Sequence, residues 1–283
     1  MADLTPELRR EFAPVDCRQP VEALVVALEG SRLCGAAWGQ RQPGSTAILW
    51  PPRVLDGVDS TVEGRLTIAV AKALDDAGIR MAQVLLSDRS SPLATTLRSA
   101  GFTCLTELLY LNWECRASEV RATTNIEFEP YSDAALARLR SIVERTYEAT
   151  QDCPALGGQR PVEEVLDGYR ATGAVRPDCW WYVRSGGADV GVLLLTEHAT
   201  ANHWELLYMG LVPSVRGRKL GSAVVQHAQR LAQTAGAERL VLAVDAENHP
   251  AIKMYNNTGF VVWDRRTVFV RFRGGDSEST ESP

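Results

Sequence analysis

From Leu206 to Phe260 the chain has the sequence LLYMGLVPSVRGRKLGSAVVQHAQRLAQTAGAERLVLAVDAENHPAIKMYNNTGF, and the other elements are arranged around this stretch. An apolar run ends at Pro213, and a short basic turn covers residues 214–220. Apolar residues then recur at helical spacing from Gly221 to Gly236, and glycine commonly ends a helix. The apolar run Leu240–Val244 predicts a buried strand. The predicted order is therefore strand, basic turn, helix and strand.

The basic turn contains Arg216, Gly217, Arg218 and Lys219 immediately before the predicted helix. The first N–H groups of a helix have no partner inside the helix, and the helix dipole makes that end positive. A pyrophosphate can bind at such an end, and glycines such as Gly217 allow the backbone to approach a ligand closely. Taken alone, the pattern is more typical of a solvated turn than of a phosphate site.

Two motifs in this stretch resemble the GNAT superfamily, the GCN5-related N-acetyltransferases. The family signature Gln/Arg-x-x-Gly-x-Gly/Ala corresponds to residues 216–221, in which Arg216 and Gly221 match and Lys219 stands where the family usually has Gly. Residues 248–260 are similar to the family's Asn-x-x-Ala-x-x-x-Tyr-x-x-x-Gly-Phe stretch, with Asn248 and Tyr255 at the polar positions.

The resemblance implies a site for acetyl-CoA or another short acyl-CoA in the cleft where the fourth and fifth strands of the fold separate. Backbone N–H groups of the turn and the first helical residues would hold the pyrophosphate, and those of the preceding strand end would contact the pantetheine and the thioester oxygen. Lys219 either weakens one close backbone approach or adds a cation near the phosphates. The expected cofactor-binding residues are Leu211, Val212, Arg216, Gly217, Arg218, Lys219, Leu220, Gly221, Ser222 and Asn248.

Acyl transfer to an amine needs a base for the ammonium, donors for the oxyanion and an acid for the departing thiolate. The resemblance implies Tyr255 as the acid, although a Tyr packed on its helix with a bonded hydroxyl is the alternative. It also implies Glu205 as the base, eleven residues before Arg216. Strand alternation would place Glu205, Leu207 and Met209 on one face, and burial would raise the pKa of Glu205. The alternative is a Glu at the start of the strand that is exposed or paired with a nearby Arg.

Three further side chains near the expected site have ordinary structural explanations. Asn248 has a place at the strand end that suits the cofactor, and it also suits the N-cap of a helix beginning at Pro250. Cys153, in the loop that could border the acceptor site, lacks a convincing His or acid partner in sequence, which argues against a nucleophile. Trp180 and Trp181 are expected in the core rather than in a ligand platform.

The composition is that of an ordinary globular protein, with 283 residues, 45% hydrophobic and 23% charged. The net charge of −5 argues against a nucleic acid partner, and no apolar run has the length of a membrane span. The charged N-terminus lacks an apolar signal core, so we expect a cytoplasmic protein, as a monomer or homodimer. Six cysteines without Cys-x-x-Cys spacing, together with four histidines, make a metal site improbable.

The first half of the chain repeats the element order of the second half at an offset of 158 residues. Gly78 matches Gly236, and Gly101-Phe102 matches Gly259-Phe260. Val58 and Glu63 stand at the positions of Arg216 and Gly221, so the phosphate turn is missing. We therefore expect an α/β (α+β) fold with two tandem GNAT-like domains, each a mixed, mostly antiparallel sheet flanked by helices. The expected divisions are a degenerate, structural domain 1–118, an acyltransferase domain 119–273 and a disordered tail 274–283.

The sequence thus predicts an acetyl-CoA-dependent N-acetyltransferase that transfers the acyl group directly to a primary amine of a small molecule or peptide. The alternative is a non-catalytic acyl-CoA-binding sensor or scaffold, in which Lys219 marks a lost activity. A purely structural tandem protein is the third possibility, and it predicts no binding of CoA.

Overall fold

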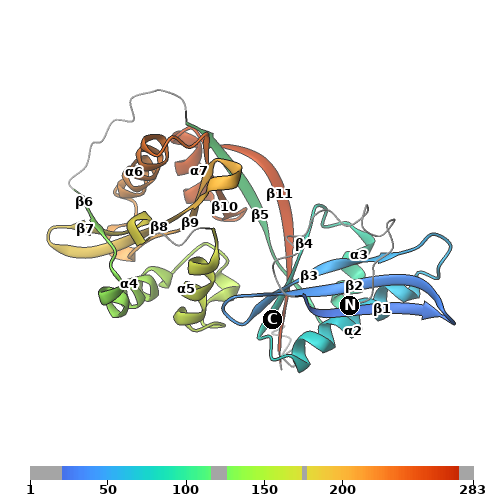
Figure 1. The fold of residues 1–283 in the computed structure, drawn as a ribbon. Helices are drawn as coiled ribbons and strands as arrows, with labels where there is room; N and C mark the ends of the chain where they lie inside the picture. The colour runs from blue at the N-terminus through green and yellow to red at the C-terminus, as the bar shows by residue number, and fades with distance from the viewer. Residues whose placement is uncertain (1–20, 116–125, 174–176, 274–283) are drawn as a thin grey trace, which may run out of the picture. The chain divides into compact units, whose positions relative to one another are not determined.

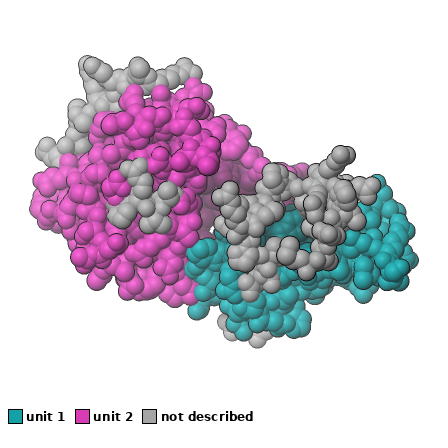
Figure 2. All heavy atoms as spheres, viewed as in Figure 1, with its two compact units in different colours: residues 1–84, 92–102, 270–283 teal, residues 85–91, 103–269 magenta. Residues whose placement is uncertain are grey.

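Residues 21–115, 126–173 and 177–273 are described by the structure, a computed structural model (Figure 1). The expected boundary between the two domains, at residue 118, and the expected tail 274–283 lie outside the described residues. The chain divides into two compact units, coloured separately in Figure 2. Unit 1 comprises residues 1–84, 92–102 and 270–283, and unit 2 comprises residues 85–91 and 103–269.

Unit 1 is built on the strand order β1-β2-β3-β4, in which β1, β2 and β3 are antiparallel neighbours and β3 and β4 are parallel. The first two strands form an antiparallel hairpin. Helix α2 buries the apolar face that its spacing predicts, including Leu66, Val70 and Leu74. The elements that begin in this part of the chain are β1 (Val21–Glu29), β2 (Arg32–Gln42), β3 (Thr46–Val54), α2 (Thr61–Asp76), β4 (Met81–Leu86) and α3 (Pro92–Ser99).

Unit 2 has the strand order β11-β5-β10-β9-β8-β7-β6, in which β9 and β10 are parallel and β10-β5, β9-β8, β8-β7 and β7-β6 are antiparallel. Its strands are β5 (Thr103–Glu114), β6 (Glu127–Pro130), β7 (Trp180–Ser185), β8 (Ala188–His198), β9 (His203–Leu211), β10 (Arg239–Asp245) and β11 (Val261–Phe272), whose last three residues belong to unit 1. Its helices are α4 (Leu136–Tyr147), α5 (Val162–Ala171), α6 (Leu220–Thr234) and α7 (His249–Asn257).

The two-fold repeat predicted from the sequence is confirmed in the element bounds. Adding 158 to the end of α2, Asp76, gives Thr234, the end of α6, and the same addition converts Thr103–Glu114 of β5 into Val261–Phe272 of β11. The chain after Phe260 forms one long strand, β11. Strand β5 pairs with β10 along the whole length of β10, so it lies in unit 2 although it ends the first sequence repeat.

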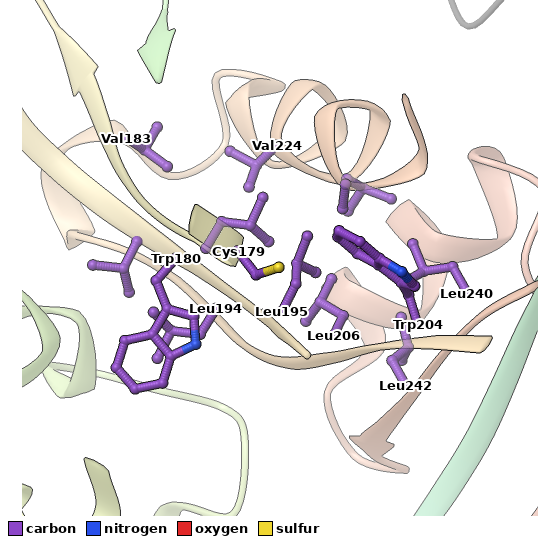
Figure 3. Close-up of a cluster of buried hydrophobic side chains, with 14 of the residues drawn as sticks. Cys179, Trp180, Val183, Leu194, Leu195, Trp204, Leu206, Val224, Leu240 and Leu242 are labelled. Atoms are coloured by element: carbon purple, nitrogen blue, oxygen red, sulfur yellow. The ribbon is translucent and has the colours of Figure 1, made fainter. Parts of the chain in front are cut away.

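The core of unit 2 lies beneath α6 on one face of the sheet. Trp204 and Leu206 of β9, Leu240 and Leu242 of β10, and Val224 of α6 are each no more than 5% exposed (Figure 3). On the opposite face Trp180 is buried, with its ring centroid 5.6 Å from that of Tyr131. The core position expected for Trp180 is therefore confirmed. Burial of these aromatic and branched side chains supplies the main stabilisation of the unit.

Helix α6 also places an uncharged histidine in an aromatic cluster. The ring of His227 stacks on Phe128, with centroids 3.7 Å apart and planes at 12°, and it meets the edge of Trp181 at 5.1 Å. Burial and the neighbouring Arg230 lower the pKa of His227 from 6.5 to about 4. Because protonation would put a charge between these rings, the folded state keeps the imidazole neutral.

We expect this histidine to make stability depend on pH. The unfolded chain binds the proton below its pKa of 6.5 while the folded chain resists it down to about 4, so stability is full above pH 6.5 and is lost as pH falls through that window. Allowing for partial solvent screening, wild type should lose about 1 kcal/mol more than His227→Phe between about pH 7 and about pH 5. Urea unfolding of both proteins at the two pH values measures this, and parallel losses would contradict it.

No helix among the described residues combines the length and the apolar character needed to cross a membrane.

Candidate active site

Strands β9 and β10 separate part-way along their length. Their parallel pairing runs from His203 opposite Arg239 to Leu206 opposite Leu242 and then stops. A cavity of about 190 Å³ lies where they have separated, between the β9 end, the loop after α4 and the start of α7. Its lining residues are Thr146, Ala149–Asp152, Leu206–Leu211, Arg216, Ala243, Val244, Asn248, Pro250, Ala251 and Tyr255.

A β-bulge in β9 changes which side chains reach the cavity. Leu194 of β8 pairs with Tyr208 and Leu195 pairs with Leu206, so Leu207 has no partner on β8. A bulge of this kind ends strict alternation of side chains. The expectation that Glu205, Leu207 and Met209 share one face is therefore wrong. Beyond the bulge, the Tyr208 hydroxyl bonds Thr146 Oγ1 of α4 at 2.7 Å.

The basic turn has the backbone geometry of an anion site. A short 3-10 turn, Pro213–Val215, leads to Gly217 with φ +75° and Lys219 with φ +63°, and α6 begins at Leu220. The amides of Val215 and Arg216 donate within the 3-10 turn, whereas the first N–H groups of α6 have no helical acceptor. Lys219 adopts the left-handed conformation that a Gly would take at this signature position. The substitution thus keeps the turn rather than remodelling it.

One basic side chain of the turn bonds the protein itself, and two others are exposed to solvent. The Arg216 guanidinium donates to three backbone carbonyls, those of Leu211 at 2.9 Å and of Thr146 and Ala149 at 2.8 Å each. This side chain therefore fastens the C-terminal end of α4 to the end of β9. Arg218 and Lys219 are exposed and form no ion pair with any described residue. These two cations, with the backbone amides, are the groups available to a phosphate.

The left-handed backbone conformation of Lys219 can be tested by two substitutions that remove the same charge. Lys219→Gly should leave stability unchanged or raise it by up to about 1 kcal/mol, because Gly adopts φ > 0 without a Cβ clash. Lys219→Val removes the same charge but places a β-branched side chain where φ is positive, and should lower stability by about 2 kcal/mol. Thermal unfolding of both variants tests this; equal stability would show that the turn adopts another conformation.

At the end of β9, one backbone amide points toward the edge of the strand from which β10 has separated. Val212 N–H donates to Val190 O at 2.9 Å, so the expected role of Val212 N–H as a ligand donor is wrong. Successive amides of a strand point to opposite edges, which turns Leu211 N–H toward the side from which β10 has parted. Gly221 has a further reason to lack a side chain, since a Cβ there would lie 2.6 Å from Met254 Sδ of α7.

Tyr255 lies on α7 and lines the cavity while only 6% exposed. Its ring packs edge-on against Phe260 at 5.6 Å. Among the described residues its hydroxyl has no hydrogen-bond partner, unlike the bonded packing tyrosine considered as the alternative. Burial, and to a smaller degree the negative charge of Asp152, raise the pKa of Tyr255. The phenol therefore stays protonated near neutral pH and can donate a proton into the cavity.

Glu205 occupies a different environment from the one expected for a base. Its Oε2 bonds His198 Nε2 at 2.8 Å, its side chain is 32% exposed, and it does not line the cavity. The His198 ring in turn stacks on His203 at 4.6 Å. The partner is thus a histidine rather than the Arg considered as the alternative.

Asn248 caps α7, as its position predicts, since its Oδ1 accepts from Ala251 N–H at 3.3 Å. Its side chain also hydrogen-bonds the carboxylate of Asp152, which lines the cavity. The sequence placed the loop of Asp152 near the acceptor site but indicated no role for its carboxylate, because the partners Asp245 and Asn248 lie far away in the chain. The sequence signal that could have indicated this pair is Asp245, because a carboxylate directly after a buried apolar run lies at a strand end, where loops meet.

Asp245 is 2% exposed and fixes the loop that contains Asp152. Its Oδ1 accepts from Thr106 Oγ1 at 2.7 Å and from Glu247 N–H at 2.9 Å, and its Oδ2 accepts from Cys153 N–H at 2.9 Å. Thr106 comes from β5, the strand that ends the first sequence repeat. The first repeat thus supplies one support of this site.

A second cavity of about 310 Å³ adjoins the first, with Thr150 and Gln151 lining both. Cys153, Asp245 and Glu247 also line it. Burial and the nearby Asp152 and Asp245 raise the pKa of the Cys153 thiol, so the thiolate that a nucleophile requires is disfavoured. Within the described ranges, no group of three or more His, Cys, Asp or Glu has the arrangement of a metal site.

A family model described as "Acetyltransferase (GNAT) family" matches residues 142–260, a span from within α4 to just beyond α7 that builds the cavity. Residues 142–260 thus form a segment of the GNAT acetyltransferase type. The signature turn, the parted strands and Tyr255 all lie within the matched GNAT segment.

Several relatives are named mycothiol acetyltransferase. That of Corynebacterium efficiens is 35% identical over 115 residues, covering 31% of this chain and 39% of the relative. That of Corynebacterium aurimucosum is 26% identical over 265 residues, covering 87% and 83%. The alignment with the Arthrobacter sp. (strain FB24) protein, at 32% identity, covers 25% and 22%. The chain thus spans well under half the length of several of these relatives.

Solved GNAT structures show the same fold over most of the chain. The GCN5-related N-acetyltransferase from Sphaerobacter thermophilus has a TM-score of 0.62 at 15% identity, covering 97% of this chain and 87% of that one. The tandem GNAT protein from the clavulanic acid biosynthesis pathway has a TM-score of 0.51 at 14% identity, covering 91% and 86%. The fold class expected from the sequence, with two GNAT-like repeats and mostly antiparallel sheets flanked by helices, is confirmed.

Proposed function

We propose that unit 2 is an acetyl-CoA-dependent N-acetyltransferase that acts on a primary amine. The observation that supports this most is the opening between β9 and β10, which ends in a cavity lined by Tyr255 and Leu211. Acetyl-CoA would place its pyrophosphate on the amides of residues 217–222 and its thioester in the cavity. Arg218 and Lys219 would add positive charge near the phosphates. Arg216 would contribute indirectly, by bonding the carbonyls at the end of α4 and so fixing the position of that end.

The residues of the cavity suit direct transfer. Leu211 N–H would polarise the thioester carbonyl, and the Tyr255 hydroxyl would protonate the departing thiolate. Asn248 would stabilise the start of α7, which lines the cavity, by capping this helix. A base on β9, Glu205, remains a prediction from the resemblance, and its bond to His198 would have to open for that role.

The first repeat is proposed to be structural and without a cofactor. The α2 N-terminus has Glu63 in its first turn, where a carboxylate would oppose a phosphate. We place the division between the two sequence domains near residue 118, with β5 contributing to unit 2. The relatives named mycothiol acetyltransferase favour a small-molecule amine as acceptor over a protein.

Calorimetric titration with acetyl-CoA, followed by release of free thiol in the presence of candidate amines, tests the function. Micromolar binding together with thiol release that depends on an amine is expected. Binding without turnover for amino sugars, aminothiols, polyamines and lysine peptides would favour the sensor. Absence of binding would overturn both assignments and leave a structural protein.

A further inference from the structure

One carboxylate at the cavity has no role in the steps described above. Asp152 follows α4 in the loop that covers the cavity, and it lines the cavity together with Asn248 and Tyr255. The residue is exposed at the surface, so a solute can reach it. Its Oδ1 nevertheless accepts from the backbone N–H of Asp245 at 3.0 Å, which turns the carboxyl group inward.

The position of Asp152 is fixed by neighbours on three elements. Asp245, buried at the end of β10, holds Cys153 N–H at 2.9 Å and is itself held by Thr106 of β5 at 2.7 Å. Asn248 at the start of α7 supports the same carboxylate. Both carboxylate oxygens of Asp245 are thereby occupied within the protein, whereas Asp152 remains open to the cavity. A loop carboxylate braced in this way is preorganised for a ligand.

A second group indicates that a ligand belongs between these residues. The Tyr255 side chain is deeply buried, since the residue is 6% exposed, and it lines the cavity with a hydroxyl that has no partner among the described residues. The hydroxyl oxygen itself is not buried, so it is open to the cavity and can hydrogen-bond a ligand there. Asp152 and Tyr255 line the same cavity, and the charge of Asp152 adds to the effect of burial in raising the pKa of Tyr255. Desolvation also raises the pKa of Asp152, as a base requires.

We propose that Asp152 binds the ammonium group of the acceptor and serves as the base that deprotonates it. This inference rests on the proposed acetyltransferase function and assigns the acceptor end of the same site. The acceptor class is a cationic primary amine, which a carboxylate opposite a neutral phenol would select over a neutral or anionic molecule.

The proton balance of the reaction is closed by the two groups. The ammonium gives one proton to Asp152, and the free amine attacks the thioester carbonyl to form the C–N bond. Collapse of the tetrahedral intermediate breaks the C–S bond, and the thiolate takes the Tyr255 proton. The nitrogen then returns its second proton to the Tyr255 phenolate, and Asp152 releases its proton to solvent. One ammonium and one acetyl-CoA give one amide, one CoA thiol and one proton.

Two small nucleophiles separate a base from a merely structural residue. Ethanolamine is largely an ammonium near neutral pH and needs a base, whereas hydroxylamine is largely unprotonated and does not. With saturating acetyl-CoA, Asp152→Asn should lower transfer to ethanolamine by about a hundredfold and change transfer to hydroxylamine little. Asp167→Asn is the matched control, since that carboxylate on α5 is 60% exposed and lies outside the site.

Acetyl-CoA binding by calorimetry shows that each variant is folded. If Asp152→Asn does not bind, Asp152→Ala replaces it, because Ala cannot mispair with Asn248. Equal losses for both nucleophiles, unchanged transfer to ethanolamine, or a loss in Glu205→Gln without one in Asp152→Asn would overturn the inference. So would a wild type that binds acetyl-CoA but transfers to neither probe. A wild type that does not bind acetyl-CoA would instead refute the proposed function.

Discussion

Replacing Tyr255 by Phe should lower kcat by about a hundredfold while leaving the affinity for acetyl-CoA unchanged. The reason is that the hydroxyl lines the cavity, has no partner among the described residues and keeps its proton, because burial raises its pKa. Phe preserves the packing on Phe260 and removes only the proton donor. Stopped-time assays of CoA thiol release give kcat, and calorimetry gives the affinity.

Tyr182→Phe is the control for this substitution. Tyr182 lies on β7, is 1% exposed, and donates its hydroxyl proton to Ala135 O at 2.9 Å, outside the cavity. Its loss should cost about 1 kcal/mol of stability and leave kcat unchanged. If Tyr255→Phe matched this control in kcat, Tyr255 would be a packing residue and the thiolate would leave without its help.

The order of helices and strands could be predicted from the spacing of apolar residues and from the glycines and prolines at the ends of elements. Apolar spacing predicted a helix from Gly221 to Gly236, and α6 runs from Leu220 to Thr234. The offset of 158 residues relates β5 to β11 residue for residue, although few identities connect the two halves. Glycines that end helices and strands are local signals, and they persist when side chains on the surface change.

The parts of the site that were mispredicted depend on pairing between strands. Strict alternation placed Glu205 with Met209, but the bulge at Leu207 shifts the register of β9 against β8. A bulge is set by how two strands pair, and nothing in the residues of β9 alone signals it. The same is true of Val212, whose amide is taken by Val190 of the neighbouring strand.

Long-range polar partners were also outside the reach of sequence reasoning. Arg216 belongs to a motif whose resemblance implies a cofactor contact, yet its guanidinium bonds carbonyls 67 and 70 residues earlier in the chain. Asp152 and Asp245 become a pair only when the loop after α4 meets the end of β10. Their spacing in sequence contains no periodicity that could have joined them. The motif therefore predicted where the site lies, whereas the roles of its side chains depend on tertiary contacts.

Placing a negative charge at the start of α6 should weaken cofactor binding without harming the fold. Ser222 is the third residue of α6, and a carboxylate in the first turn of a helix stabilises it by about 0.3–1 kcal/mol. In the complex, however, the carboxylate introduced by Ser222→Glu would face the pyrophosphate at the same helix end. We expect the affinity for acetyl-CoA to fall at least tenfold, equivalent to about 1.4 kcal/mol, while the melting temperature stays the same or rises.

Ser222→Gln separates this charge effect from the size of the new side chain, because Gln has nearly the same volume as Glu and no charge. The Glu variant should bind more weakly than the Gln variant, and the gap between them should narrow at high salt, where exposed charges are screened. Opposite movements of stability and affinity would be hard to obtain from a general disturbance of α6, since a disturbed helix lowers both. Equal binding by the two variants would place the phosphates away from this helix end, and the signature turn would then be a solvated turn.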